Sequence, residues 1–354
     1  MPHALLITGA SGFVGSHAVK YALNNFFYDN IIATDLRKGN GASLYSNDTE
    51  FQFLQADFTS PDGLAKIRSA MENLRDYKFV IWHIGGLFNY SASASLLYKV
   101  NVIGTRNLMT MLQESKFDIQ RFIFWSGGVV YGDFNHPDGK LPASEEYPIK
   151  PQDDYGWSKK SAEDWILFYN RTFHLPTTIM RLGAIYGPNS RYGMACAILL
   201  NASGQLAPLL VGDKENMAGL IHAEDVVRVA DFLSWAEEAN GEIYNVVDNS
   251  RSVSEVAKFI GEQVHNKPFG GFRLPAWVLK TLIKLVTKRA KQLGGTPVID
   301  PELGKMTIIS SWMSNEKLMR LAKKHHQEAT LLRHPDSFTG LKETIDWYKE
   351  EKWI

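Results

Sequence analysis

Short apolar runs alternate with amphipathic stretches along the chain, most regularly in its first half. Seven runs have the character of buried strands, at 4–8, 31–36, 51–57, 78–84, 121–126, 177–187 and 241–248. Four stretches between them repeat apolar residues at helical spacing, at 19–25, 64–74, 96–115 and 161–173. Continuous apolar strands are typical of parallel sheets that helices cover on both faces. The pattern predicts an α/β fold with a doubly wound parallel sheet of the Rossmann type.

The alternation is regular up to about residue 180 and then loosens. Beyond Gly187, glycine, proline and asparagine interrupt the apolar runs until the strand-like stretch at 241–248. We therefore expect a dinucleotide-binding domain over 1–180, with about 217–250 folding back onto it. The other segments, 181–216 and 251–354, are expected to form a smaller, mixed substrate-binding domain.

Residues 8–15, TGASGFVG, lie between the first predicted strand and the first predicted helix. In such a turn, the first glycine permits the tight bend and the second lets the backbone approach a pyrophosphate. The third allows close packing of helix and strand. Gly9, Gly12 and Gly15 have the required spacing, although 28 glycines produce it by chance in roughly one such chain in five.

Asp35 strengthens this interpretation because it closes the second predicted strand, 20 residues beyond Gly15. An acid at this place binds the 2′-hydroxyl of an adenosine ribose. Its charge would repel the 2′-phosphate of NADP, so NAD is the expected cofactor. Arg37 and Lys38 follow closely and keep NADP as the alternative.

Composition and charge narrow the class of protein. Lys and Arg together number 38, and so do Asp and Glu. The formal net charge is therefore zero and gives no reason to expect a nucleic-acid partner. The one cysteine, Cys196, excludes an internal disulfide and suits a reducing compartment. The start MPHALLITGA lacks the basic segment of a secretory signal, and no apolar run is long enough to cross a membrane. These features predict a cytoplasmic protein.

Several motifs, in a fixed order, resemble the extended short-chain dehydrogenase/reductases, also called the NAD-dependent epimerase/dehydratase family. They are TGASGFVG, ADFTS (56–60), VIWHIGG (80–86), NVIGTRNL (101–108), YGWSK (155–159), RLGAIYGP (181–188), LIHAEDV (220–226) and YNV (244–246). The resemblance covers about 3–250 and implies a structural role near the site for Asn101. It also implies a set of cofactor-binding residues: Gly9, Gly12, Phe13, Val14, Gly15, Asp35, Asp57 at the adenine, Phe58, Ile84, Gly85 and Lys159.

Within YGWSK, Tyr155 and Lys159 match the YxxxK pair of this family. A phenol of pKa 10 needs about 4 kcal/mol of extra stabilisation of its anion to titrate near pH 7. One cation at about 5 Å supplies roughly 3 kcal/mol at an effective dielectric of about 20. Lys159, one helical turn away, can be that cation, so we expect Tyr155 to act as general acid/base. A second match, Tyr348 and Lys352, lies in a charged C-terminal stretch and is expected on a solvated helix face.

The family's third catalytic group is a Ser or Thr hydroxyl that binds the substrate oxygen. Its usual position, four residues before Tyr131, is Gly127 here, and Ser126 lies one residue earlier. We expect Ser126 to supply the hydroxyl from a slightly rebuilt loop; the alternative is a purely structural role at the strand end. The acid pair of the family's dehydratases is replaced by Gly128 and Val129, which argues against sugar dehydration.

The substrate is predicted from weaker signals. Nucleotide-sugar enzymes of the family often carry an Arg where this chain has Ala218, although Arg191 could compensate. The stretch 274–293 has one apolar and one basic face, so it is either a core-packed helix or a membrane-surface helix. It resembles 3β-hydroxysteroid dehydrogenase-like members, which favours an NAD(P)-dependent oxidoreductase for a hydrophobic, sterol- or lipid-like alcohol or ketone. A nucleotide-sugar epimerase with tightly bound NAD is the alternative, followed by a non-catalytic dinucleotide sensor.

The remaining expectations concern partners and metals. Family dimers bury two helices per subunit, and 93–114 and 155–172 are more apolar than one buried face requires, which predicts a homodimer. A small-molecule substrate is the other expected partner. We expect His83 in the core and His325 and His326 on a solvated face. No cluster has metal-ligand spacing, so no metal site is expected.

Overall fold

The computed structural model describes residues 1–25, 27–38, 51–89, 92–132, 134–191, 193, 199, 209–211, 216–268, 272–275, 277–278, 281, 284–285, 289 and 310–354. Cys196 and most of the amphipathic stretch 274–293 lie outside these ranges, so the predicted membrane-surface helix is not placed. Among the described helices, none has the length and apolar character needed to cross a membrane.

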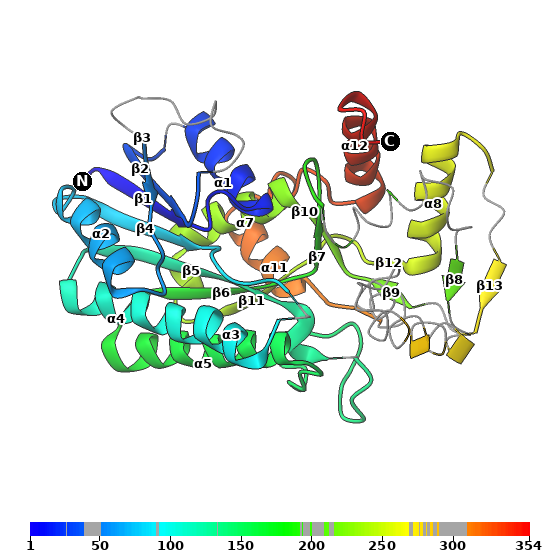
Figure 1. Ribbon diagram of the computed structural model, residues 1–354, viewed down its shortest axis with the longest axis horizontal. Coiled ribbons are helices and arrows are strands. Elements are labelled where there is room, and N and C mark those ends of the chain that lie inside the picture. Colours follow the sequence, from blue (N-terminus) through cyan, green and yellow to red (C-terminus); the bar gives the residue numbers. More distant parts are fainter. Residues whose placement is uncertain are drawn as a thin grey trace.

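Seven parallel strands form one central sheet, in the order β11-β6-β5-β4-β1-β2-β3 (Figure 1). The strands are β1 His3–Thr8, β2 Asn30–Asp35, β3 Phe51–Gln55, β4 Lys78–His83, β5 Ile119–Gly127, β6 Thr177–Leu182 and β11 Ile243–Val246. The chain builds outward from β1 to β3, returns to β4 on the other side of β1, and builds outward again. The reversal between β1 and β4 is the point at which such sheets bind ligands. The order confirms the predicted Rossmann fold.

Helices cover both faces of this sheet (Figure 1). One face carries α1 Phe13–Asn24, α7 Ala223–Trp235 and α11 Glu316–Lys324, and the other carries α2 Pro61–Glu72, α4 Thr105–Ser115 and α5 Asp154–Phe173. Leu5 and Ile7 of β1 pack in the first layer, whereas Leu6 packs in the second. Because each strand is buried on both faces, its sequence is a continuous apolar run.

The predicted helix at 96–115 is observed as three consecutive elements. They are α3 Ala94–Leu97, the π-helix η2 Tyr98–Gly104 and α4. Wider π-helical turns occur frequently at functional sites. Asn101 lies in this turn, so its side chain is placed by backbone geometry that helical periodicity does not reveal.

Outside this sheet and its covering helices, the named elements of the described residues include short strand pairs and two helices that pack on each other. The pairs are β7 Ala184–Tyr186 with β10 Leu220–His222, β9 Met217–Ala218 with β12 Arg251–Ser252, and β8 Leu209–Val211 with β13 Phe272–Leu274. The helices are α8 Val253–His265 and α12 Ser337–Glu350, and two short 3₁₀ turns are η3 Gly128–Tyr131 and η4 Glu237–Ala239. α8 begins with a capping box, in which Ser252 and Glu255 each accept the other's backbone N–H.

The positions of Tyr348 and of α11 differ from what the sequence suggests. Tyr348 of α12 is fully buried and its hydroxyl donates to the Ser190 carbonyl, so the predicted solvated face is wrong at this residue. Periodicity in a charged stretch did not reveal it because the apolar face of α12 is completed by α8. In addition, α11 packs on the central sheet beside α7 rather than with the late segments around it. His325 and His326 are exposed, as predicted.

Candidate active site

The TGASGFVG turn between β1 and α1 leaves almost no room for side chains. Gly9 has a φ of +70°, and a Cβ there would lie 2.7 Å from Gly85. A Cβ on Gly15 would lie 1.9 Å from the Gly9 carbonyl oxygen. Gly12 is the N-cap of α1, and its N–H donates to the same oxygen. The turn therefore brings the backbone of Gly12, without a side chain, to the N-terminus of α1, which fits a dinucleotide pyrophosphate.

Asp35 lies beside this turn at the end of β2. One carboxylate oxygen accepts from the Ser11 N–H at 2.9 Å and the other from the Leu36 N–H at 2.7 Å. The Ser11 hydroxyl donates to the Arg37 carbonyl, which ties the same two segments together. Each carboxylate oxygen has a second lone pair, so Asp35 can still accept ribose hydroxyls. The residues present thus fit NAD.

The predicted adenine side of the site is formed by Asp57 and Phe58. The Asp57 carboxylate accepts from both the backbone N–H and the hydroxyl of Thr59, which fixes the turn into α2. The Phe58 ring lies between two glycines, since a Cβ on Gly85 or Gly104 would approach it to 2.8 or 2.7 Å. The structure therefore places Phe58 against Gly85, two residues that the resemblance assigns to the cofactor.

His83, at the end of β4, links β1 to the start of α4. The Thr8 hydroxyl accepts from the Gly85 N–H and donates to Nδ1 of His83 at 2.7 Å. The Thr105 hydroxyl donates to the Asn101 carbonyl, so Nε2 of His83 donates to Thr105 at 2.9 Å. This pattern requires a neutral ring, and burial, together with a nearby lysine charge, lowers the pKa of His83 to about 3. The predicted core role of His83 is confirmed.

Tyr155 and Lys159 lie in the first turns of α5, at the carboxyl edge of the sheet. Asp153 caps this helix by accepting the Gly156 N–H at 2.7 Å. The Tyr155 ring is half-buried and meets Phe88 edge-on at 5.3 Å between centroids. Lys159 Nζ lies 6.0 Å from the centroid of the Tyr155 ring. The predicted catalytic pair is thus brought together.

The Lys159 side chain is buried and held in one place. Its ammonium donates to the Trp125 carbonyl at 2.9 Å and lies 4.9 Å from the centroid of the Phe124 ring. Burial lowers the pKa of Lys159 to about 8, while the Glu163 carboxylate acts in the opposite direction. The lysine therefore keeps its charge at neutral pH against a cost of desolvation.

Asn101 connects the loop after β4 to α5. Its amide binds both the N–H and the carbonyl of Leu87, at 2.7 and 3.1 Å, and donates to the Ser158 hydroxyl at 3.0 Å. Ser158 in turn donates to the Tyr155 carbonyl. A Cβ on Gly86 would lie 3.1 Å from the Asn101 oxygen, so this loop packs closely over the amide. Asn101 positions the site, in agreement with the structural role that the resemblance implied.

Ser126 lies next to the pair, but its hydroxyl is already engaged. It donates to Glu163 of α5 at 2.6 Å, and Glu163 also binds Arg181 of β6, with Nη2 at 2.8 Å. All three side chains are buried. This geometry favours the structural alternative for Ser126 over direct contact with substrate. Sequence reasoning missed Glu163 and Arg181, although Glu163 continues the four-residue spacing of Tyr155 and Lys159.

Glycines 127 and 128 have different surroundings. A Cβ on Gly127 would meet its nearest neighbour, Val129, at 3.6 Å, which is ordinary contact distance. A Cβ on Gly128 would lie 2.5 Å from the sulfur of Met313. Met313 belongs to a segment that hydrogen-bonds both the N–H and the carbonyl of Ala143. A thioether therefore fills the space beside Gly128, one of the two positions at which the family resemblance implies an acid in the dehydratases.

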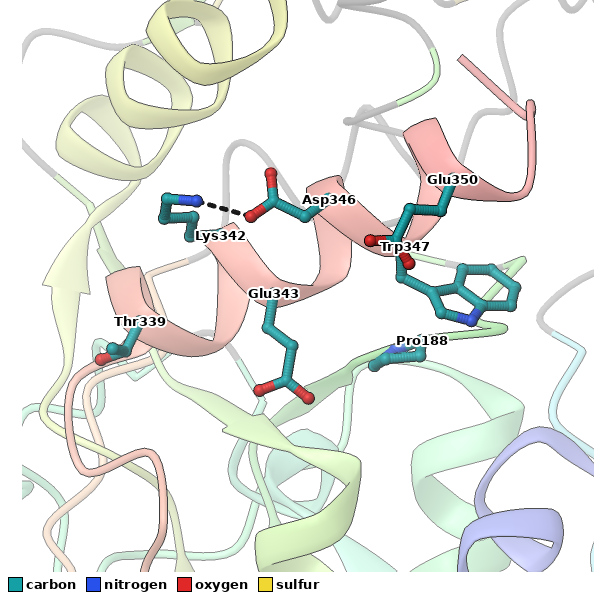
Figure 2. A pocket seen from close by; sticks show the side chains of 7 residues that line it. All are labelled: Pro188, Thr339, Lys342, Glu343, Asp346, Trp347 and Glu350. Carbon is teal, nitrogen blue, oxygen red and sulfur yellow. Dashed lines mark hydrogen bonds and ion pairs between the residues drawn. The ribbon is translucent and has the colours of Figure 1, made fainter.

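A cavity of about 450 Å³ lies beside α12, with Glu343 pointing away from that helix and Trp347 next to Pro188 (Figure 2). It is lined by Pro188, Thr339, Lys342, Glu343, Asp346, Trp347 and Glu350. None of the predicted catalytic or cofactor residues lines it. Its acidic character does not suit a phosphate-bearing ligand.

Near this cavity, ring nitrogens of His222 and His334 and an oxygen of Glu343 lie within 4.8 Å of one another. His334 faces carboxylates on both sides, with Nε2 3.0 Å from Glu343 and Nδ1 3.4 Å from Asp225. Nδ1 of His222 accepts the Glu224 N–H, which leaves the proton on Nε2, where a metal would need a lone pair. Nε2 of His222 has no hydrogen-bond partner among the described residues.

Comparisons with known proteins place the chain in a family. Residues 5–246 match the family described as "NAD dependent epimerase/dehydratase family". A provisionally named UDP-glucose 4-epimerase from Methanocaldococcus jannaschii is 30% identical over 325 residues, covering 88% of this chain and 98% of that protein. A dTDP-glucose 4,6-dehydratase from Escherichia coli is 28% identical over 295 residues, covering 75% of this chain and 79% of that protein.

A solved structure has the same fold. The dTDP-glucose 4,6-dehydratase DesIV from Streptomyces venezuelae, with NAD and TYD bound, superposes with a TM-score of 0.72 at 22% identity. The match covers 99% of this chain and 98% of that chain.

These matches confirm the predicted enzyme class and the predicted cofactor, NAD. They do not support the predicted resemblance of 274–293 to 3β-hydroxysteroid dehydrogenases, because the two relatives are named for nucleotide sugars. The glycine turn, the acid at the end of β2 and the Tyr-Lys pair on α5 have the order and placement that this chemistry needs. The chain belongs to the NAD-dependent epimerase/dehydratase family of extended short-chain dehydrogenase/reductases.

Proposed function

We propose that this protein is an NAD-dependent epimerase that acts on a nucleotide sugar. The observation that carries the proposal is the position of Tyr155 and the buried Lys159 at the sheet edge that also holds the glycine turn. NAD, when bound, supplies the hydride acceptor and donor. The chain itself has to hold the cofactor, place the sugar and move one proton.

Each of these tasks has a candidate residue. Gly9 and Gly15 allow the turn to close, Gly12 lets its backbone approach the pyrophosphate, and Asp35 can accept the ribose hydroxyls. Tyr155 removes the proton of a sugar hydroxyl as its carbon is oxidised, and returns a proton when that carbon is reduced from the other face. The Lys159 ammonium stabilises the phenolate form of Tyr155.

Epimerisation fits the surroundings of β5 better than dehydration. Elimination of water needs an acid that protonates the leaving hydroxyl. At the positions of the dehydratase acids, this chain has Gly128 and Val129, and Met313 fills the space above Gly128. Transient oxidation and reduction of one carbon needs only the Tyr155 phenol and NAD.

The proposed substrate replaces the hydrophobic one that the sequence favoured. The relatives are named for UDP- and dTDP-glucose, and both match over most of this chain. Ala218, in place of the usual Arg, lies in β9, and Arg191 stacks on the Trp353 ring at 4.7 Å. The substrate phosphate is therefore expected to have a protein partner other than Ala218.

The proposal is tested by incubating the purified protein with UDP-glucose, UDP-galactose, their N-acetyl forms and dTDP-glucose. We expect one pair to interconvert without added NAD and without net NADH, as followed by proton NMR and absorbance. Formation of a 4-keto-6-deoxy sugar would show a dehydratase instead. If the protein retains NAD but converts none of these sugar nucleotides, the proposal is wrong.

A simple alcohol dehydrogenase is the second candidate. It is favoured by Gly127 and Ala218, since both positions lack a polar group that the nucleotide-sugar members carry. Such an enzyme would accumulate NADH with a secondary alcohol in proportion to product. The same absorbance measurement, with and without added NAD, separates the two candidates.

A further inference from the structure

Tyr155, Lys159 and Glu163 recur every four residues and therefore lie on one face of α5. This face packs against β5, where Lys159 contacts Trp125 and Glu163 contacts the next residue, Ser126. Lys159 donates to the Trp125 carbonyl at 2.9 Å, and Ser126 donates to Glu163 at 2.6 Å. Lys159 is 6% exposed and Glu163 is 1% exposed, so two opposite charges lie one helical turn apart and away from water.

A second cation fixes the Glu163 carboxylate. Arg181 binds it through two N–H groups, Nε at 3.1 Å and Nη2 at 2.8 Å. On its other side, Arg181 donates to the Tyr131 hydroxyl and to the Glu145 carbonyl. Such two-point pairing holds the carboxylate in one orientation.

The other titratable groups around Lys159 cannot replace this anion. His83 on β4 is neutral, Tyr155 is the group whose ionisation has to be assisted, and Arg181 on β6 is itself positive. Burial lowers the pKa of Lys159 to about 8, and Glu163 is the group that opposes this effect. Removal of the Glu163 charge would leave Lys159 and Arg181 as two buried cations without an anion between them.

We propose that Glu163, held by Arg181 and Ser126, is a positioning residue that keeps the Lys159 ammonium charged beside Tyr155. The inference rests on the proposed function, in which Tyr155 moves the proton. Without the carboxylate, Lys159 would release its proton near neutral pH, and the Tyr155 phenolate would lose its neighbouring cation. Ser126 thus acts through Glu163 and not on the substrate.

A direct test follows the ionisation of Tyr155 by the near-ultraviolet absorbance of tyrosinate in the NAD-loaded protein. Subtraction of the same titration of Tyr155→Phe isolates this phenol from the other tyrosines. Glu163→Gln is expected to move the Tyr155 titration to higher pH by about one unit, the effect of one charge at short range. Ser126→Ala is the matched control, because it removes a hydrogen bond to Glu163 but no charge, and should move the titration by only about a few tenths of a unit.

Turnover of UDP-glucose against pH is the second readout. Glu163→Gln should lower the rate about tenfold at pH 7, with a loss that narrows as the pH rises. An equal loss at every pH, with an unmoved Tyr155 titration, would overturn the proposal, since Glu163 would then only hold α5 on the sheet. An unchanged rate with an unmoved titration would overturn it as well.

A double variant keeps the test possible if Glu163→Gln alone does not fold. Glu163→Gln combined with Arg181→Gln leaves no unpaired guanidinium in the core, and the Tyr155 titration is expected to move in the same direction. If Tyr155→Phe keeps normal turnover, the role of Tyr155 in the proposed function is wrong, whereas the absorbance titration still decides the role of Glu163.

Discussion

A methyl group on Gly15 would lie 1.9 Å from the carbonyl oxygen of Gly9 and 2.8 Å from the α-carbon of Ala10. These neighbours are backbone atoms of the turn itself, so they cannot move aside as a flexible side chain would. Gly15→Ala is therefore expected to distort the turn and to weaken NAD binding by at least about tenfold, roughly 1.4 kcal/mol. Calorimetric titration with NAD measures the effect.

Gly127→Ala is the matched control for this variant. Its added methyl would meet Val129 at 3.6 Å, and the backbone of Gly127 is in the extended region that any residue adopts. Normal NAD affinity is expected. If Gly15→Ala binds NAD as tightly as Gly127→Ala does, the close packing of the turn is not what selects glycine.

Asp35 gives a prediction about the choice of cofactor. Hydrogen bonds to a charged group contribute about 1.5–3 kcal/mol, so Asp35→Ala should weaken NAD by about ten- to a hundredfold. NADP should lose less, because the repulsion between carboxylate and 2′-phosphate is also removed. Asp35→Asn keeps an acceptor for the Ser11 N–H but removes the negative charge. It therefore distinguishes the effect of the carboxylate charge from the effect of the turn geometry. Tighter binding of NADP than of NAD by the unmodified protein would contradict the assignment.

The fold was predictable because burial on both faces leaves a strong signal in the sequence. Strands such as β1 and β4 are continuous apolar runs, and the glycine turn and Asp35 lie at the ends of β1 and β2. Tyr155 and Lys159 were accessible from spacing because one helix carries both. Those parts of the site needed only local sequence.

The rest depends on segments that meet only in three dimensions. Met313 reaches Gly128 from almost the other end of the chain, and no local pattern predicts that contact. The hydroxyl of Ser126 looked available from sequence, but its direction is set by the buried pair of Glu163 and Arg181. The hydrophobic substrate was inferred from 274–293, where an amphipathic pattern alone does not distinguish packing on protein from packing on lipid.

A homodimer remains a prediction, but the structure changes which residues are expected to form the interface. Leu108 and Met111, two apolar residues of the stretch 93–114 from which the interface was predicted, belong to the core of the protomer. Other apolar side chains of α3, η2 and α5 are 43–55% exposed: Leu96, Tyr98, Trp157, Phe168 and Phe173. Exposed apolar side chains gathered on two neighbouring helices are typical of protein interfaces.

Light scattering at micromolar concentration tests the dimer. Phe168→Glu should convert a dimer to a monomer, because the charge would be buried without a partner. Phe27→Glu is the control, since Phe27 is also exposed but packs against Trp235 on the opposite face of the sheet. A monomeric mass of the unmodified protein would contradict the prediction.

His334 predicts how stability depends on pH. Burial alone would lower its pKa, but the carboxylates of Asp225 and Glu343 prevail and raise the pKa above 6.5. A raised pKa in the folded state means that the imidazolium stabilises the fold fully below pH 6.5. This contribution is lost as the pH rises through the folded pKa, and it amounts to about 1.4 kcal/mol for each pH unit that separates the folded from the unfolded pKa.

The free energy of unfolding by urea, measured from pH 5.5 to 8.5, should therefore fall as the pH rises across this window. His334→Gln cannot be protonated and should flatten that part of the curve. His326→Gln is the control, since His326 is exposed. An identical slope in His334→Gln would show that another group causes the pH dependence.

Tyr155→Phe separates catalysis from binding. The ring keeps its edge-on contact with Phe88, while the hydroxyl that carries the proton is removed. Loss of a general acid/base should lower kcat by about 10²–10⁴-fold. NAD affinity should stay within about twofold, because the glycine turn and Asp35 are unchanged. Lys159→Ala should instead weaken both, since the family places this ammonium on the nicotinamide ribose. Turnover of UDP-glucose and calorimetric titration with NAD measure both quantities, and near-normal turnover of Tyr155→Phe would mean that another group moves the proton.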